Sequence, residues 1–419
     1  MKVLWLLNFL PPAMCRELGI NVQASGSWVT ALLGALQRPD ITNPASITLC
    51  GYSCDIHQKH CRKIKGISYI GLPANAGKNM LKEVLDEVKP DLVQLFGTEN
   101  DHSLHLFELF DPEKILVYIQ GLAAPCGEHM TDGLPEYFLD ANPLKEVAAL
   151  HTGGLTVRQQ KEKLANRGIK EENVIRKAHY ILGRTDWDRE YCLRLNPRAE
   201  YFHLGEIMRP SFYPGGWRRE RCLPHRIFVS QANAPLKGFH RAIQALPELC
   251  RRWPDTQLYV AGWPPPDKGP LLRPLMNWLS EYTGYLAKLA KILGVEGHIH
   301  YTGILDEVGM RHQLMAAETF LICSNIENSP NALGEAMLMG LPCVASAVGG
   351  IPSMLEPGQG ILFDPEEKDA LAASIIALWE DPANADRLGR SARMRALEDH
   401  DPVEIAHAQI DIYKKLIHS

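Results

Sequence analysis

The chain is 419 residues long, with 46% hydrophobic and 22% charged residues, a composition that excludes a disordered or fibrous protein. Because one hydrophobic core rarely serves so long a chain, we expect two domains of roughly 150–200 residues each. The formal net charge of −5 provides no overall positive field, so we expect no nucleic-acid partner.

The first apolar run, Val3 to Leu10, contains Asn8 and is stopped by Pro11 and Pro12. It is shorter than the ~20 residues of a membrane helix, and no small-residue cleavage site of a signal peptide follows it. We therefore interpret it as a buried first strand and expect a cytoplasmic protein. Most of the ten cysteines should then be reduced thiols in the core.

A cluster of possible metal ligands follows an apolar run at 47–50. Its members are Cys50, Cys54, His57, His60 and Cys61. The spacing contains no paired CxxC framework, so zinc is a minor alternative to a solvated loop after a strand.

Short apolar runs alternate with stretches of helical period along the first half of the chain. The expected strands are Val3–Asn8, Ser46–Cys50, Leu92–Phe96 and Ile115–Ile119, and the expected helices are Trp28–Leu36 and Met80–Val88. This alternation predicts a parallel α/β sheet. Turn formers and charges at 212–219 indicate a linker, which places the domain boundary near residue 215.

The same alternation recurs in the second half and predicts a second doubly wound sheet. Its expected strands are Arg226–Ser230, Gln257–Ala261, Ile299–Thr302, Thr319–Ser324 and Pro342–Ala345, with a helix over Phe239–Cys250. A proline-rich rim loop is expected at 263–270, and a closing helix at 402–419. We thus expect a first domain of residues 1–215, with 402–419 packing back on it, and a second domain of residues 216–401.

The segment 324–337 is the most informative, because ligands of open α/β sheets bind beyond the carboxyl ends of strands. It follows an expected strand and enters a helix near Asn331. A helix start offers unpaired N–H donors and a positive dipole end to a phosphate. The residues that would supply these donors are Asn331, Ala332 and Leu333.

Two carboxylates flank this helix start and could face one crevice from different depths. Glu327 lies at the strand end and Glu335 about one turn into the helix. Carboxylates in such a place can bind sugar hydroxyls. The alternative is that both side chains only stabilise the positive end of the helix dipole.

The two glutamates, with Gly340-Leu341-Pro342 and Gly349-Gly350-Ile351-Pro352 after them, strongly resemble glycosyltransferase family 4 over residues 319–366. The resemblance implies the GT-B architecture, in which two Rossmann-like domains place their parallel sheets toward a central cleft. It implies retaining transfer of a sugar from a UDP- or GDP-sugar to a hydroxyl acceptor, with no essential metal. Glu327 would contact hydroxyls of the donor sugar, and Glu335 those of the ribose.

By the same resemblance, Lys237 and Gly238 match the Lys-Gly pair that the family places beside the donor pyrophosphate. A lysine there neutralises charge on the leaving group. The family usually has an arginine five residues earlier, where this chain has Ala232. Gln231, Asn233 or a basic residue elsewhere must then compensate, and Arg184 is our candidate.

The resemblance is weaker in the first half. Gly26-Ser27 matches a reduced form of the glycine loop that approaches the donor phosphate, although Gly26 also suits a simple turn. Gln120 stands where the family commonly has a histidine, so His102 or His129 would have to supply any imidazole. We expect the loop that ends at His102 to face the acceptor.

The expected partners are a nucleotide-sugar donor and a glycan or lipid-linked acceptor, in synthesis of cell-surface polysaccharide or glycoconjugate. Basic stretches at 62–65 and 161–177 suggest peripheral contact with the inner face of a membrane, although charge runs are usually solvated. Two other interpretations stay open. One is a sucrose-phosphate-like synthase or a glycogen phosphorylase relative, and the other is an inactive nucleotide-sugar-binding protein.

Overall fold

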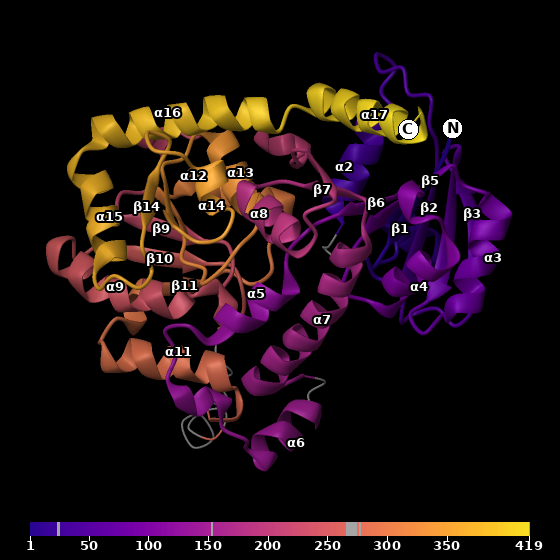
Figure 1. The fold of residues 1–419 in the computed structure, drawn as a ribbon. Helices are drawn as coiled ribbons and strands as arrows, with labels where there is room; N and C mark the ends of the chain where they lie inside the picture. Colours follow the sequence, from indigo (N-terminus) through magenta and orange to yellow (C-terminus); the bar gives the residue numbers. More distant parts are fainter. Residues whose placement is uncertain (23–25, 152–153, 265–274, 276–277, 419) are drawn as a thin grey trace. The chain divides into compact units, whose positions relative to one another are not determined.

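The computed structural model describes residues 1–22, 26–151, 154–264, 275 and 278–418 (Figure 1). The chain forms two compact units. The first contains Met1–Ala124, Asn166–Arg209 and Asp399–Ser419, and the second contains Pro125–Ala165 and Pro210–Glu398.

The first unit is built on an eight-stranded sheet of order β3-β4-β2-β1-β5-β6-β7-β8. The strands are β1 Lys2–Leu7, β2 Ser46–Ser53, β3 His60–Ile64, β4 Ile67–Pro73, β5 Leu92–Phe96, β6 Ile115–Tyr118, β7 Tyr180–Gly183 and β8 Glu200–His203. Neighbours pair in parallel, apart from β3 and β4. The helices are α1 Pro12–Leu18, α2 Ser27–Leu36, α3 Lys78–Val88, α4 Asp101–Leu109, α8 Asp186–Leu195 and α17 Pro402–His418, with α5 Ala123–Glu128 and α7 Val157–Lys177 crossing between the units.

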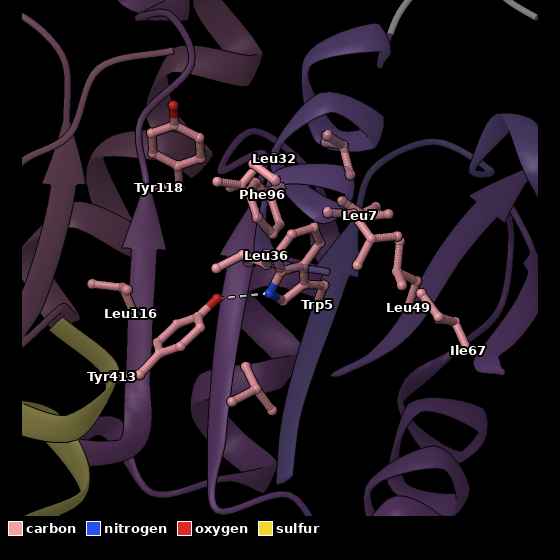
Figure 2. Close-up of a cluster of buried hydrophobic side chains, with 14 of the residues drawn as sticks. Trp5, Leu7, Leu32, Leu36, Leu49, Ile67, Phe96, Leu116, Tyr118 and Tyr413 are labelled. Atoms are coloured by element: carbon pink, nitrogen blue, oxygen red, sulfur yellow. Dashed lines mark hydrogen bonds between the residues drawn. The ribbon is translucent and has the colours of Figure 1, made fainter. Parts of the chain in front are cut away.

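The central strand β1 is buried on both faces because helices cover both sides of the sheet. Its odd-numbered residues, such as Trp5, pack with α2 and α17 in one core, and its even-numbered residues pack with α3 and α7 in another. Figure 2 shows the first core, where Trp5 Nε1 donates a hydrogen bond of 2.8 Å to Tyr413 Oη of α17. The closing helix α17 therefore belongs to the first unit.

The segment with the possible metal ligands contains the solvated loop that the sequence suggested, at 54–59 after β2, and then enters a β-hairpin that was not predicted. His60 and Cys61 lie on β3, which turns at Lys65 and Gly66 into β4. Both turn residues have positive φ, 50° and 85°, as a tight hairpin turn requires. Within the described residues, no group of three His, Cys, Asp or Glu side chains could hold a metal ion.

The second unit is built on a six-stranded parallel sheet of order β11-β10-β9-β12-β13-β14. The strands are β9 Arg226–Val229, β10 Gln257–Val260, β11 Ile299–Tyr301, β12 Thr319–Ile322, β13 Cys343–Ser346 and β14 Ile361–Phe363. Its helices include α6 Pro143–His151, α9 Phe239–Arg252, α11 Glu281–Ile292, α12 Glu307–Ala316, α13 Asn331–Met339, α14 Ile351–Met354, α15 Ala370–Glu380 and α16 Pro382–Asp399. None of the helices in the described ranges is long and apolar enough to cross a membrane.

Residues 125–165 group with the second unit, whereas the sequence places them in the first domain. The physical reason is tertiary packing. Met130, Phe138 and Val157 are buried in the same core as β9 and α9. The Asn325 amide nitrogen also donates to the backbone carbonyls of His129 and Asp132, at 3.0 and 3.2 Å.

A buried carboxyl group fastens α7 inside the first unit. Glu171 is 1% exposed, and its two oxygens accept hydrogen bonds of 2.6 Å from Thr98 Oγ1 and the Ala123 backbone N–H. Burial raises the pKa of Glu171 to about 8, against the smaller opposing effect of these two hydrogen bonds. The group is therefore largely protonated at neutral pH.

The raised pKa predicts a specific pH dependence of stability. Between the unfolded pKa of about 4.3 and the folded pKa of about 8, the folded chain binds more protons at Glu171, so stability decreases as pH rises through this window. Glu171→Gln, which stays neutral, should have a thermal midpoint near that of the wild type at pH 5 and a clearly higher one at pH 8. A midpoint difference that is the same at pH 5, 6.5 and 8 would contradict the protonated state.

Candidate functional site

A cavity of about 210 Å³ lies in the second unit, beyond the carboxyl ends of β9 and β12. These strands are neighbours in the sheet, so the loops that follow them meet at one edge. The residues that line the cavity include Ser230, Gln231, Lys237, Ser324, Glu327, Pro330, Asn331 and Ala332.

An ion pair forms the polar centre of this cavity. Lys237 Nζ donates to Glu327 Oε1 at 2.6 Å, and Ser324 Oγ donates to the same oxygen at 2.8 Å. The two side chains are only 26% and 14% exposed. Within the described part of the chain, Glu327 Oε2 accepts no hydrogen bond, so that oxygen can receive a ligand hydroxyl. The serine is a residue that the sequence analysis did not single out.

Two glycines let the loops approach each other closely enough to build the cavity. Gly238 has a φ of +63°, and a Cβ there would lie 1.9 Å from the Cys323 carbonyl oxygen. Gly349 has a φ of +53°, and a Cβ there would lie 2.0 Å from the Glu327 carbonyl oxygen. That same oxygen accepts a 2.9 Å hydrogen bond from the Gly350 N–H, which fixes the backbone of the glutamate.

The helix that follows the loop begins at the predicted residue. α13 starts at Asn331, and no side chain caps it. Asn331 and Ala332 line the cavity, whereas Leu333 is fully buried behind them. Glu335 is 3% exposed and does not line the cavity, so its expected role toward a ribose stays a prediction.

Ala232 is fully buried, and its methyl side chain packs in the core of the second unit. Of the two polar neighbours proposed to compensate, Gln231 lines the cavity. Asn233 instead exchanges two 3.1 Å hydrogen bonds with the backbone of Trp263. Among the described residues that line the cavity, Lys237 carries the only positive charge.

A second cation, Arg241, lies in the first turn of α9 and was not predicted from the sequence. Its Nε approaches Asn325 Oδ1 at 3.4 Å, and its Nη2 donates to Glu366 Oε1 at 2.9 Å. Arg241 thus links the site loop to the segment after β14. Lys237 ends the short 3-10 turn Pro235–Lys237 before α9 begins, so no helical spacing in the sequence relates the two cations.

The structure places the remaining candidate residues in the first unit, with His129 as the exception. Gly26 caps α2 and lies against the Phe9 ring, and Ser27 is the first residue of that helix. Arg184 is buried and forms an ion pair with Glu206, and it donates to the Gln120 carbonyl. This geometry gives Arg184 a structural partner, so a role toward phosphate stays a prediction.

The two histidines proposed to replace an imidazole at Gln120 lie in different units. His102 is on α4, and burial lowers its pKa to about 4. His129 belongs to the second unit, and its Nδ1 lies 2.7 Å from Asp132 Oδ2. Its backbone carbonyl is held by Asn325 of the site loop, so the His129 segment lies beside the loop that carries Glu327.

Residues 224–395 match the protein family described as "Glycosyl transferases group 1". The glycogen synthase of Mycobacterium tuberculosis is 30% identical over 202 residues, which cover 48% of this chain and 45% of that protein. A GDP-mannose-dependent alpha-(1-6)-phosphatidylinositol monomannoside mannosyltransferase of Mycolicibacterium smegmatis is 32% identical over 173 residues, which cover 39% of this chain and 41% of that protein. The chain therefore spans less than half the length of these curated relatives.

Similarity to solved structures extends over the whole chain. The sucrose-phosphate synthase of Thermosynechococcus elongatus has a TM-score of 0.71 at 17% sequence identity, over 100% of this chain and 99% of that protein. At this identity the similarity concerns the fold, which is GT-B, as the sequence predicts. The chain therefore has the GT-B fold, and residues 224–395 within it match the group 1 glycosyltransferases.

Proposed function

We propose that the protein is a retaining glycosyltransferase that moves a sugar from a nucleotide-sugar donor to a hydroxyl acceptor. The observation that carries the proposal is the cavity of the second unit. There a partly buried ion pair of a lysine and a glutamate meets the uncapped start of α13. This combination supplies positive charge for a diphosphate and a carboxylate for sugar hydroxyls.

Each side chain has a defined part in the proposed reaction. Lys237 and the N–H groups at Asn331 and Ala332 stabilise the negative charge that grows on the departing diphosphate. Glu327, whose Oε1 is held by Ser324, offers Oε2 to a hydroxyl of the donor sugar. The acceptor hydroxyl attacks the anomeric carbon on the face of the leaving phosphate, which takes the proton. No side chain acts as a nucleophile, and no metal ion is required.

The donor and the acceptor are proposed by chemical class. The second unit holds a UDP- or GDP-sugar, in keeping with the family matched by residues 224–395 and with a relative whose name specifies GDP-mannose. In this proposal Gly26 and Ser27 serve the donor phosphate, Gln120 serves the transferred sugar, and the loop that ends at His102 serves the acceptor. We place the reaction in glycan synthesis in the cytoplasm, with a glycan or lipid-linked acceptor and peripheral contact with the inner face of the membrane.

A thermal-shift screen tests the donor site, because a ligand that binds the native state raises the melting temperature. UDP, GDP, ADP and their sugars are compared on the wild type and on Glu335→Ala. One nucleotide class should stabilise the wild type, by several degrees more than the variant if Glu335 contacts the ribose. If no nucleotide stabilises the wild type, the donor-site proposal fails.

A protein that binds the donor without turnover is the second candidate, and the loss of the usual arginine at Ala232 favours it. In that case the same nucleotide would stabilise the protein, but no sugar would be transferred. Turnover with inorganic phosphate and a glucan would instead indicate a phosphorylase-like reaction.

A further inference from the structure

A second and larger cavity, of about 470 Å³, lies in the first unit beyond the carboxyl ends of β1, β2 and β4. Its volume falls in the range of about 300–1,000 Å³ that is typical of small-molecule sites. Its wall includes Tyr52 at the end of β2, His102 and His105 on α4, and Lys170 on α7. All of these elements belong to the first unit.

Three polar atoms of this wall are buried without a hydrogen-bond partner among the described residues. They are Tyr52 Oη, His102 Nε2 and His105 Nδ1. Tyr52 is 5% and His102 9% exposed. Buried polar atoms are hydrogen-bonded in the great majority of cases, and each one left unpaired costs roughly 1–3 kcal/mol. Three such atoms around one cavity indicate that a ligand supplies the missing partners, reached by side-chain rotation or through ordered water.

The chemistry of the wall suits a ligand with hydroxyl groups and no charge. The Tyr52 and His102 rings stack at 4.1 Å with an interplanar angle of 12°. Burial lowers the pKa of His102 to about 4, so its ring is neutral at pH 7 and offers one donor and one acceptor. The Tyr52 hydroxyl can do both as well. A sugar hydroxyl has the same dual character and can pair with each of these groups.

The charges around the cavity do not favour an anion. Lys170 is paired with Asp101, and the Asp55 carboxylate also lines the wall. The charged side chains that line the cavity therefore carry a net charge of −1, with two aspartates against one lysine. Phosphate or uronate groups would be repelled rather than bound.

We propose that this cavity binds the acceptor as a neutral hexopyranose ring, with Tyr52, His102 and His105 as its hydrogen-bonding residues. The role of this sugar as the acceptor rests on the proposed function, whereas the existence of a sugar site in the cavity does not. Glu327 and Lys237 then serve the donor in the second unit, and His102 acts in binding and not as a charged acid.

The test uses the full chain, with the methyl α-glycosides of glucose, mannose and galactose as probes in isothermal titration calorimetry. Glucose 6-phosphate serves as the charged comparison. At least one neutral glycoside should bind the wild type, and it should bind more tightly than the phosphate. Tyr52→Phe keeps the ring that stacks on His102 and removes one hydroxyl. It should weaken binding roughly five- to ten-fold.

Tyr69→Phe is the matched control, because Tyr69 lies on the neighbouring strand β4 and does not line this cavity. It should bind the glycoside like the wild type. A structural role of Tyr52 would lower the thermal midpoint of Tyr52→Phe, whereas loss of an unpaired hydroxyl should leave it unchanged or higher. Equal affinity in Tyr52→Phe and the wild type, or tighter binding of glucose 6-phosphate, would overturn the proposal.

The same samples separate this inference from the proposed function. Stabilisation by a nucleotide without binding of any neutral glycoside would leave the donor site standing and refute the sugar site. The buried atoms would then be satisfied by water alone. Binding of a glycoside without stabilisation by any nucleotide would support the sugar site and refute the proposed transfer.

Discussion

Lys237→Ala should lower kcat by roughly 100-fold, since removal of one preorganised group that stabilises transition-state charge typically costs this much. In the structure the ammonium lies 2.6 Å from Glu327 and is the only positive charge among the described residues that line the cavity. No neighbour can take its place, because Arg241 is already bonded to Glu366. The rate of nucleoside diphosphate release from a saturating donor measures the effect.

Lys288→Ala is the control for this variant, because Lys288 is an exposed lysine of α11 in the same unit. Its kcat should equal that of the wild type. If Lys237→Ala retains more than a third of the wild-type rate, the leaving diphosphate is stabilised elsewhere. The assigned role of the lysine would then be wrong.

Gly238→Ala should destabilise the protein severely, by roughly 3 kcal/mol or more, because two costs add up. A residue with a side chain at φ +63° costs about 1–2 kcal/mol. In addition, the new Cβ would lie 1.9 Å from the Cys323 carbonyl oxygen, and that atom belongs to the backbone. The loops after β9 and β12 would have to separate, which also opens the cavity. Differential scanning calorimetry should show a thermal midpoint many degrees lower, or the variant should not accumulate in soluble form.

Gly294→Ala isolates the conformational part of that cost. Gly294 has a φ of +68°, and a Cβ there meets no atom within 4 Å. Its midpoint should fall by only a few degrees, in line with about 1–2 kcal/mol in a unit of this size. Equal losses in the two variants would mean that the close approach to Cys323 does not matter.

The sequence predicts the four middle strands of the first sheet and most strands of the second, because these buried parallel strands are continuous apolar runs, but it misses β3, β4, β7 and β8 at the edges of the first sheet. β5 occupies the predicted residues, and α13 begins at the predicted Asn331. β3 was missed because its side chains are mostly exposed and polar, so it has the composition of a loop. Its only local signal is the Lys65-Gly66 turn. The grouping of 125–165 was missed because contacts distant in sequence decide it.

Part of the candidate site could likewise be predicted from local sequence patterns, and the rest depends on contacts between residues that are distant in sequence. Lys237 and Glu327 follow adjacent strands of one sheet, so their proximity could be inferred from strand order and motif spacing. The pairing of Arg184 with Glu206 and the burial of Glu335 depend on tertiary packing that no local pattern encodes. The unpaired atoms of Tyr52, His102 and His105 become visible only when β2 and α4 come together.

Acceptor-dependent release of nucleoside diphosphate is the most direct test of the central claim, that the second unit is a working donor site. The nucleotide sugar that stabilises the protein is incubated with a panel of neutral glycosides, and release is followed for the wild type and Glu327→Gln. We predict release by the wild type that increases with one acceptor and falls by roughly 100-fold in the variant. Tight donor binding without release under any acceptor would contradict the claim and leave a nucleotide-sugar-binding protein.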